Sequence, residues 1–139
     1  MFDPSREQVR ETFFGAWRKY RAGQPLVGIE TIALDVILAH PEYHAMLGDP
    51  DRYGEKEYRE ANPFLHMSLH VALEEQLSID QPPGIVDRFR ALVQRHGERH
   101  EALHEAIECL AETVWRAQRD RLPPDAAAYL DCLDRRARK

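Results

Sequence analysis

The chain has 139 residues, of which 43% are hydrophobic and 31% charged. This composition and length are typical of a globular protein that can bury a hydrophobic core without stabilising cross-links. The formal net charge of −5 and the pI near 5.8 argue against a phosphate-binding surface and hence against a nucleic-acid partner. No apolar run reaches the roughly 20 residues of a membrane span, and the sequence does not open with a signal-peptide pattern, so we expect a cytoplasmic protein without a membrane partner.

The first half of the chain predicts two helices and a polar loop. Ser5 and Gln8 form a capping box before apolar residues at spacings of three and four, which predicts a helix over about 5–23. A second helix is predicted over about 25–40, and Pro41 either ends it or opens a short turn. Residues 48–61 are polar with little periodicity, which predicts a loop that is a candidate cover for a site.

Helical periodicity continues through the second half. Asn62 followed by Pro63 predicts a helix start, and the proline-rich segments at 81–84 and 122–125 predict breaks. The resulting helices cover about 63–78, 84–96, 98–119 and 125–136. The expected fold is therefore all-α, a single-domain bundle over 1–139 of about five helices plus a short C-terminal helix.

The two cysteines, Cys109 and Cys132, are too few and too far apart in sequence to predict a disulfide framework or a cysteine-based zinc site. We expect two thiols in a reducing compartment, neither of them catalytic.

The seven histidines all lie between His40 and His104, and two segments share one spacing. The two segments are His66-x3-His70-x3-Glu74 and His100-x3-His104-x3-Glu108. Residues four apart share a helix face, so each segment forms a ladder of metal-ligand side chains. Helical winding places the histidines of both ladders on apolar faces and the two glutamates at the edges, which predicts that the ladders meet around a metal.

The second predicted helix adds further candidate ligands. Glu30 lies among apolar residues, and an unpaired carboxylate there would cost several kcal/mol, so we expect a cation beside it. His40 and His44 follow at the end of this helix as ligands or as supporting groups. The alternative for any single inward histidine, or for Glu74 and Glu108, is a hydrogen bond or ion pair within the fold.

Imidazole and carboxylate ligands on helices indicate a divalent transition metal, mono- or dinuclear, with iron expected first and zinc or manganese as alternatives. The arrangement is similar in kind to hemerythrin, but it does not reproduce the spacings of that protein. Whether the chain is an enzyme stays open. An iron site would favour oxygen or peroxide chemistry or redox sensing, and a zinc site would favour hydrolysis.

The resemblance to a known family covers most of the chain. The segments SREQVRETFFGAWRKYRAGQPL, ALDVILAHPEYHAML, NPFLHMSLHVALEEQLSIDQPPGI and IECLAETVWRAQRDRLPPDAAAYLDCL resemble the bacterial family DUF1841. The resemblance implies a small bacterial cytosolic protein and adds no substrate and no residue role.

A second functional class stays open beside the metalloprotein. In it the histidines form a hydrogen-bonded polar layer of a metal-free helical module that meets a protein partner or a second copy of the chain, and this layer titrates near neutral pH. Haem ligation by an inward histidine is a weaker alternative, since the chain has no Cys-x-x-Cys-His motif.

Overall fold

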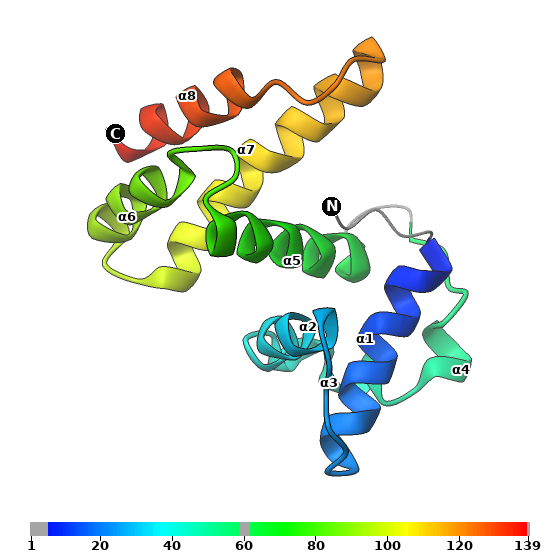
Figure 1. Ribbon diagram of the computed structural model, residues 1–139. Helices are drawn as coiled ribbons and strands as arrows, with labels where there is room; N and C mark the ends of the chain where they lie inside the picture. Colours follow the sequence, from blue (N-terminus) through cyan, green and yellow to red (C-terminus); the bar gives the residue numbers. More distant parts are fainter. Residues whose placement is uncertain (1–5, 59–61, 139) are drawn as a thin grey trace. The chain divides into compact units, whose positions relative to one another are not determined.

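The computed structural model describes residues 6–58 and 62–138 (Figure 1). Over these ranges every regular element is a helix and no strand is present, which confirms the all-α class. The chain divides into two compact units, residues 1–71 and 72–139. The boundary falls inside α5 (Pro63–Ile79), whose residues up to Val71 belong to the first unit.

The first unit is built around the pairing of α1 (Arg6–Arg21) with α2 (Ile29–Leu38). The apolar residues of α1 recur at three and four and are buried, which confirms the predicted helix, while the predicted cap Ser5 lies outside the described residues. The core combines residues of α1, α2, α3 (His44–Leu47) and the start of α5: Phe13, Phe14, Ala16, Trp17, Ala33, Val36, Ile37, Met46, Leu47, Phe64, Met67 and Val71.

Two segments of this unit differ from their predicted bounds. α2 begins at Ile29 rather than near residue 25, because Gly28 before it has a φ of 55°, outside the helical region. Pro41 opens a short 3-10 helix, η1 (Pro41–Tyr43), that leads into α3. The predicted loop 48–61 contains α4 (Pro50–Tyr53), because the Asp49 side chain accepts a hydrogen bond from the Arg52 N–H at 3.3 Å and caps a helical turn.

A buried arginine holds this segment to α1. Arg10 is only 3% exposed, and its Nη1 donates to the carbonyl oxygens of Tyr53 and Gly54 at 3.1 and 3.0 Å. The guanidinium carbon lies 4.7 Å from the ring centroid of Phe64 and 5.7 Å from that of Tyr58. Burial lowers the pKa of Arg10, yet an arginine retains its charge near neutral pH. Arg10 therefore joins α1, the end of α4 and the start of α5 around one cation.

The second unit contains α6 (Ile85–His96), α7 (Arg99–Asp120) and α8 (Ala126–Ala137), which pack pairwise. These three helices and α5 begin and end within one residue of their predicted bounds. Each break has a local cause. Gly97, with a φ of 75°, ends α6, and Asp125 caps α8 by accepting the Ala128 N–H at 3.0 Å. None of the helices in the described ranges is long and apolar enough to cross a membrane.

Cys109 of α7 and Cys132 of α8 form a disulfide, with their Cα atoms 5.9 Å apart. The expectation of two thiols is therefore wrong. The cysteines are 23 positions apart in the chain, but α8 folds back beside α7 after the break at 122–125 and brings them together (Figure 1). Distance along the chain does not limit a disulfide once two helices pack side by side.

Candidate metal centre

α5 presents two histidines on successive turns. The Asn62 side chain accepts the N–H groups of Phe64 and Leu65 at 2.9 and 3.2 Å and so starts the helix at Pro63. Because His66 and His70 are four residues apart, their rings share a face, with centroids 4.7 Å apart and Nε2 atoms 3.2 Å apart. His70 is 2% exposed and His66 is half-buried.

His40 joins these two from the end of α2. It is 1% exposed, and its ring centroid lies 5.1 Å from that of His66 and 4.6 Å from that of His70. Its Nδ1 lies 2.8 Å from the carbonyl oxygen of Val36. A carbonyl only accepts, so Nδ1 carries the proton and the neutral ring has its lone pair on Nε2. A backbone carbonyl that fixes the tautomer in this way is a common feature of metal-binding histidines.

The three histidines together form the candidate centre of the first unit. One ring nitrogen from each lies within 4.8 Å of the corresponding nitrogens of the other two. Tyr43 stacks on His40 with ring centroids 5.5 Å apart, and burial raises the pKa of its phenol, so the phenol is neutral near pH 7. The centre is thus a group of three imidazoles, two of them buried.

His44, predicted as a neighbour of this group, makes other contacts. Its Nε2 donates to the carbonyl oxygen of Ile37 at 2.8 Å, and its ring stacks on Trp17 with centroids 4.3 Å apart. Over the described residues of the first unit, the group of close ring nitrogens does not include His44.

Glu30 is paired with a cation, as its place among apolar residues requires, but this cation is a lysine ammonium group and not a metal ion. Lys19 of α1 contacts both carboxylate oxygens at 2.7 and 2.9 Å, and the Val27 N–H donates to one of them at 3.1 Å. These contacts, led by the Lys19 hydrogen bond, lower the pKa of the Glu30 carboxyl. The need for a metal at Glu30 therefore disappears, because the packing of α1 on α2 supplies a lysine that helix winding alone does not reveal.

The two ladder glutamates belong to the second unit and are ion-paired there. Glu74 accepts two hydrogen bonds from the guanidinium of Arg99, at 2.6 and 3.1 Å. Glu108 accepts one from Arg136 of α8. Both glutamates therefore form ion pairs within the fold, which is the alternative to metal binding that the sequence leaves open.

The second histidine ladder also lies in the second unit. The rings of His100 and His104 have centroids 4.2 Å apart, as the four-residue spacing predicts. The sequence predicts both on the apolar face of the helix, but His104 is exposed, whereas His100 is half-buried. The buried residues of α7 include Ala102, Ala106 and Cys109, and neither histidine belongs to this buried set.

Sequence reasoning missed a charged cluster in the second unit. His96 at the end of α6 contacts the Glu105 carboxylate through Nε2, and Arg95 and Arg136 lie 3.7 Å from the same carboxylate. The Glu105 side chain is only 14% exposed. Only the packing of α6, α7 and α8 brings these groups together, so no local signal could have found them.

Comparison with known proteins identifies the family of the chain. No curated protein and no solved structure matches the chain significantly. Residues 5–135 match a family described as a domain of unknown function, DUF1841. Because this match covers nearly the whole chain, the resemblance in the sequence is confirmed and the protein belongs to the DUF1841 family.

Proposed function

We propose that the first unit binds a divalent transition metal through His40, His66 and His70. The observation that carries this function is the 3.2 Å separation of the Nε2 atoms of His66 and His70. Metal–imidazole bonds of about 2.0–2.1 Å place two ligand nitrogens of a tetrahedral site about 3.3 Å apart. Two of the three ligand atoms thus have the spacing that binding requires, and the carbonyl of Val36 orients the third ring.

The ligand set also bears on the choice of metal. The expectation of iron depends largely on carboxylate ligands, and Glu30, Glu74 and Glu108 all form ion pairs with cationic side chains. Neutral imidazoles without thiolates suit zinc as well as iron. A mononuclear site is therefore the simplest form of the proposal, with zinc, iron and manganese as the metals to try.

The repeated spacing still predicts His104 as a further ligand, with His100, Glu74 and Glu108 as weaker candidates. This part of the proposal depends on the sequence alone. A His104→Gln variant tests it. If His104 is a fourth ligand, the variant should bind the metal more weakly than the wild type. If His104 is not a ligand, the two affinities should be equal.

The test is metal content and affinity in matched variants. We expect about one metal per chain in protein purified without chelator or reconstituted with zinc or cobalt(II). His66→Gln and His70→Gln should each weaken binding at least about tenfold, because each removes one ligand from the metal. The control is His44→Gln, which removes an imidazole from the same unit but keeps a donor for the Ile37 carbonyl. Metal far below one per chain, with no uptake on reconstitution, would refute the proposal.

The short contact between His66 and His70 also favours a second function, that of a metal-free helical module. Without a metal, a proton between the same two Nε2 atoms makes a hydrogen bond, as in a metal-free polar layer. In that case a chelator should leave stability unchanged, and His70→Gln should alter the pH dependence of unfolding without any effect of added metal.

A further inference from the structure

The disulfide of the second unit borders a cavity. The cavity has a volume of about 440 Å³ and is lined by the C-terminal half of α7, the connection that follows it and residues 128–135 of α8. Cys132 lines it, whereas Cys109 does not and is completely buried. The two cysteines of one bond therefore differ in access, because only Cys132 belongs to the lining of a space that a small molecule can enter.

This difference in access determines which of the two sulfurs an incoming thiol attacks. In thiol–disulfide exchange a thiolate attacks one sulfur from the side opposite the other sulfur, which leaves. A thiol in the cavity would reach Cys132, and Cys109 would be the leaving group. The volume suits an amino-acid or tripeptide thiol and is too small for a folded protein thiol.

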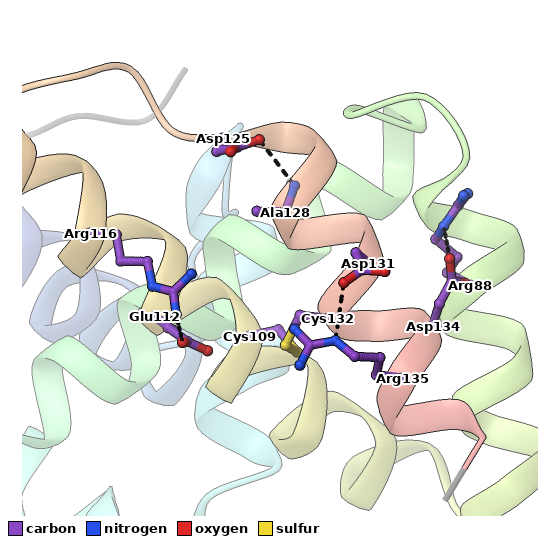
Figure 2. Close-up of polar contacts among 10 residues, drawn as sticks. All are labelled: Arg88, Cys109, Glu112, Arg116, Asp125, Ala128, Asp131, Cys132, Asp134 and Arg135. Carbon is purple, nitrogen blue, oxygen red and sulfur yellow. Dashed lines mark hydrogen bonds and ion pairs between the residues drawn. A yellow bond between two sulfur atoms is a disulfide. The ribbon is translucent and has the colours of Figure 1, made fainter.

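The cavity lining carries both signs of charge, which indicates the class of thiol. Three arginines and four acidic residues line it: Arg116, Arg119, Arg135, Glu112, Asp120, Asp125 and Asp131. Figure 2 shows the Glu112 and Arg116 pair of α7 on one side of the disulfide and the Asp131 and Arg135 pair of α8 on the other. Both pairs are solvent-exposed, and exposed ion pairs contribute little to stability, so their groups can change partners at small cost. A ligand with both an ammonium and a carboxylate complements such a lining.

We propose that Cys132 is a site of S-thiolation by a small zwitterionic thiol that enters this cavity. The thiolate of the ligand forms a new S–S bond with the Cys132 sulfur, and the Cys109–Cys132 bond breaks. Cys109 leaves as a thiolate and takes a proton from solvent. No net oxidation occurs, because one disulfide replaces another. A second equivalent of thiol then releases its own disulfide and leaves both cysteines reduced.

Other contacts keep α8 in place during this reaction. Tyr129 and Leu133 are buried, and the Tyr129 hydroxyl donates to Gln76 at 2.8 Å. Arg88 of α6 pairs with Asp134 of α8 at 3.2 Å (Figure 2). The mixed disulfide is therefore expected in a folded chain, with the helix content unchanged.

The experiment uses reduced glutathione and the full oxidised chain. After acid quenching and alkylation, mass spectrometry of the peptides should find glutathione on Cys132 and the alkyl group on Cys109. Ala128→Leu should slow the reaction several-fold, because residue 128 lies one turn before Cys132 and also lines the cavity. The control is Ala127→Leu, an exposed position of the same helix outside the lining, which should react at the wild-type rate.

A comparison of two thiols tests recognition. Glutathione and the neutral 2-mercaptoethanol are each measured on the folded chain and on the chain unfolded in urea, which corrects for intrinsic reactivity. The folded-to-unfolded rate ratio should be several-fold higher for glutathione. Adducts mainly on Cys109, reaction only after unfolding, or equal ratios for the two thiols would overturn the proposal.

Discussion

The Nε2 atoms of His66 and His70 lie 3.2 Å apart on successive turns of α5. This distance suits a shared proton and a shared metal, since a hydrogen bond spans about 2.7–3.2 Å and two imidazole ligands of a tetrahedral metal lie about 3.3 Å apart. The two arrangements respond differently to added metal, because only the second has an affinity for it.

We predict that zinc raises the thermal unfolding temperature of the wild-type chain. A ligand at one hundred times its dissociation constant stabilises the folded state by about 2.7 kcal/mol, provided that it binds only that state. Thermal unfolding at increasing zinc concentration measures the effect. The double variant His66→Gln/His70→Gln should show no rise, and an equal rise in both proteins would place the metal elsewhere.

The Lys19–Glu30 pair predicts a loss of stability in acid. The folded pKa of Glu30 is lowered, so the pair contributes fully above the ordinary glutamate pKa of about 4.3, and its contribution is lost as the pH falls through the folded pKa. Urea unfolding between pH 7 and pH 3 should show a smaller acid-induced loss in Glu30→Gln than in the wild type. Glu30→Gln should also keep its metal, and loss of metal in this variant would return Glu30 to the ligand set.

Arg10 is predicted to be essential for the stability of the first unit. Lysine cannot reproduce the planar guanidinium that donates to two carbonyls and stacks on Phe64, so Arg10→Lys should lower the free energy of unfolding by about 2 kcal/mol. Urea denaturation provides the measurement. The matched control is Arg18→Lys on the exposed side of the same helix, which should change stability by less than about 0.5 kcal/mol. Equal effects of the two changes would contradict the role assigned to Arg10.

Reduction of the disulfide is predicted to destabilise the second unit without unfolding it. The bond closes a loop between residues 23 positions apart, and the loss of such a cross-link costs about 3 kcal/mol through the entropy of the unfolded chain. Urea unfolding of Cys109→Ala/Cys132→Ala against the oxidised wild type should show this difference. If the two midpoints coincide, the bond has no stabilising role.

Local features made most helices predictable from the sequence. The Asn62–Pro63 start, the 122–125 break and the apolar spacing along α7 each act within a few residues, and these bounds are confirmed. The predicted start of α2 is too early, because a hydrophobic pattern does not reveal the positive φ of Gly28.

The candidate site likewise contains some contacts that the sequence predicts and others that it does not. The closeness of His66 and His70 follows from helical geometry, and His40 binds the carbonyl of a residue only four positions earlier. The cations that meet Glu30, Glu74 and Glu108 come from other helices, 11, 25 and 28 positions away. Such partners depend on packing, so the sequence shows that a carboxylate needs a cation but not which cation it obtains.

The Cys109–Cys132 bond also affects what backbone cleavage does to the chain. The connection at 122–125 is exposed, and exposed connections are preferred sites of proteolytic nicking. Because the disulfide spans this connection, a cut there leaves α8 covalently attached to the rest of the molecule. A nicked molecule would keep its intact electrophoretic mobility until a reductant separates the fragments.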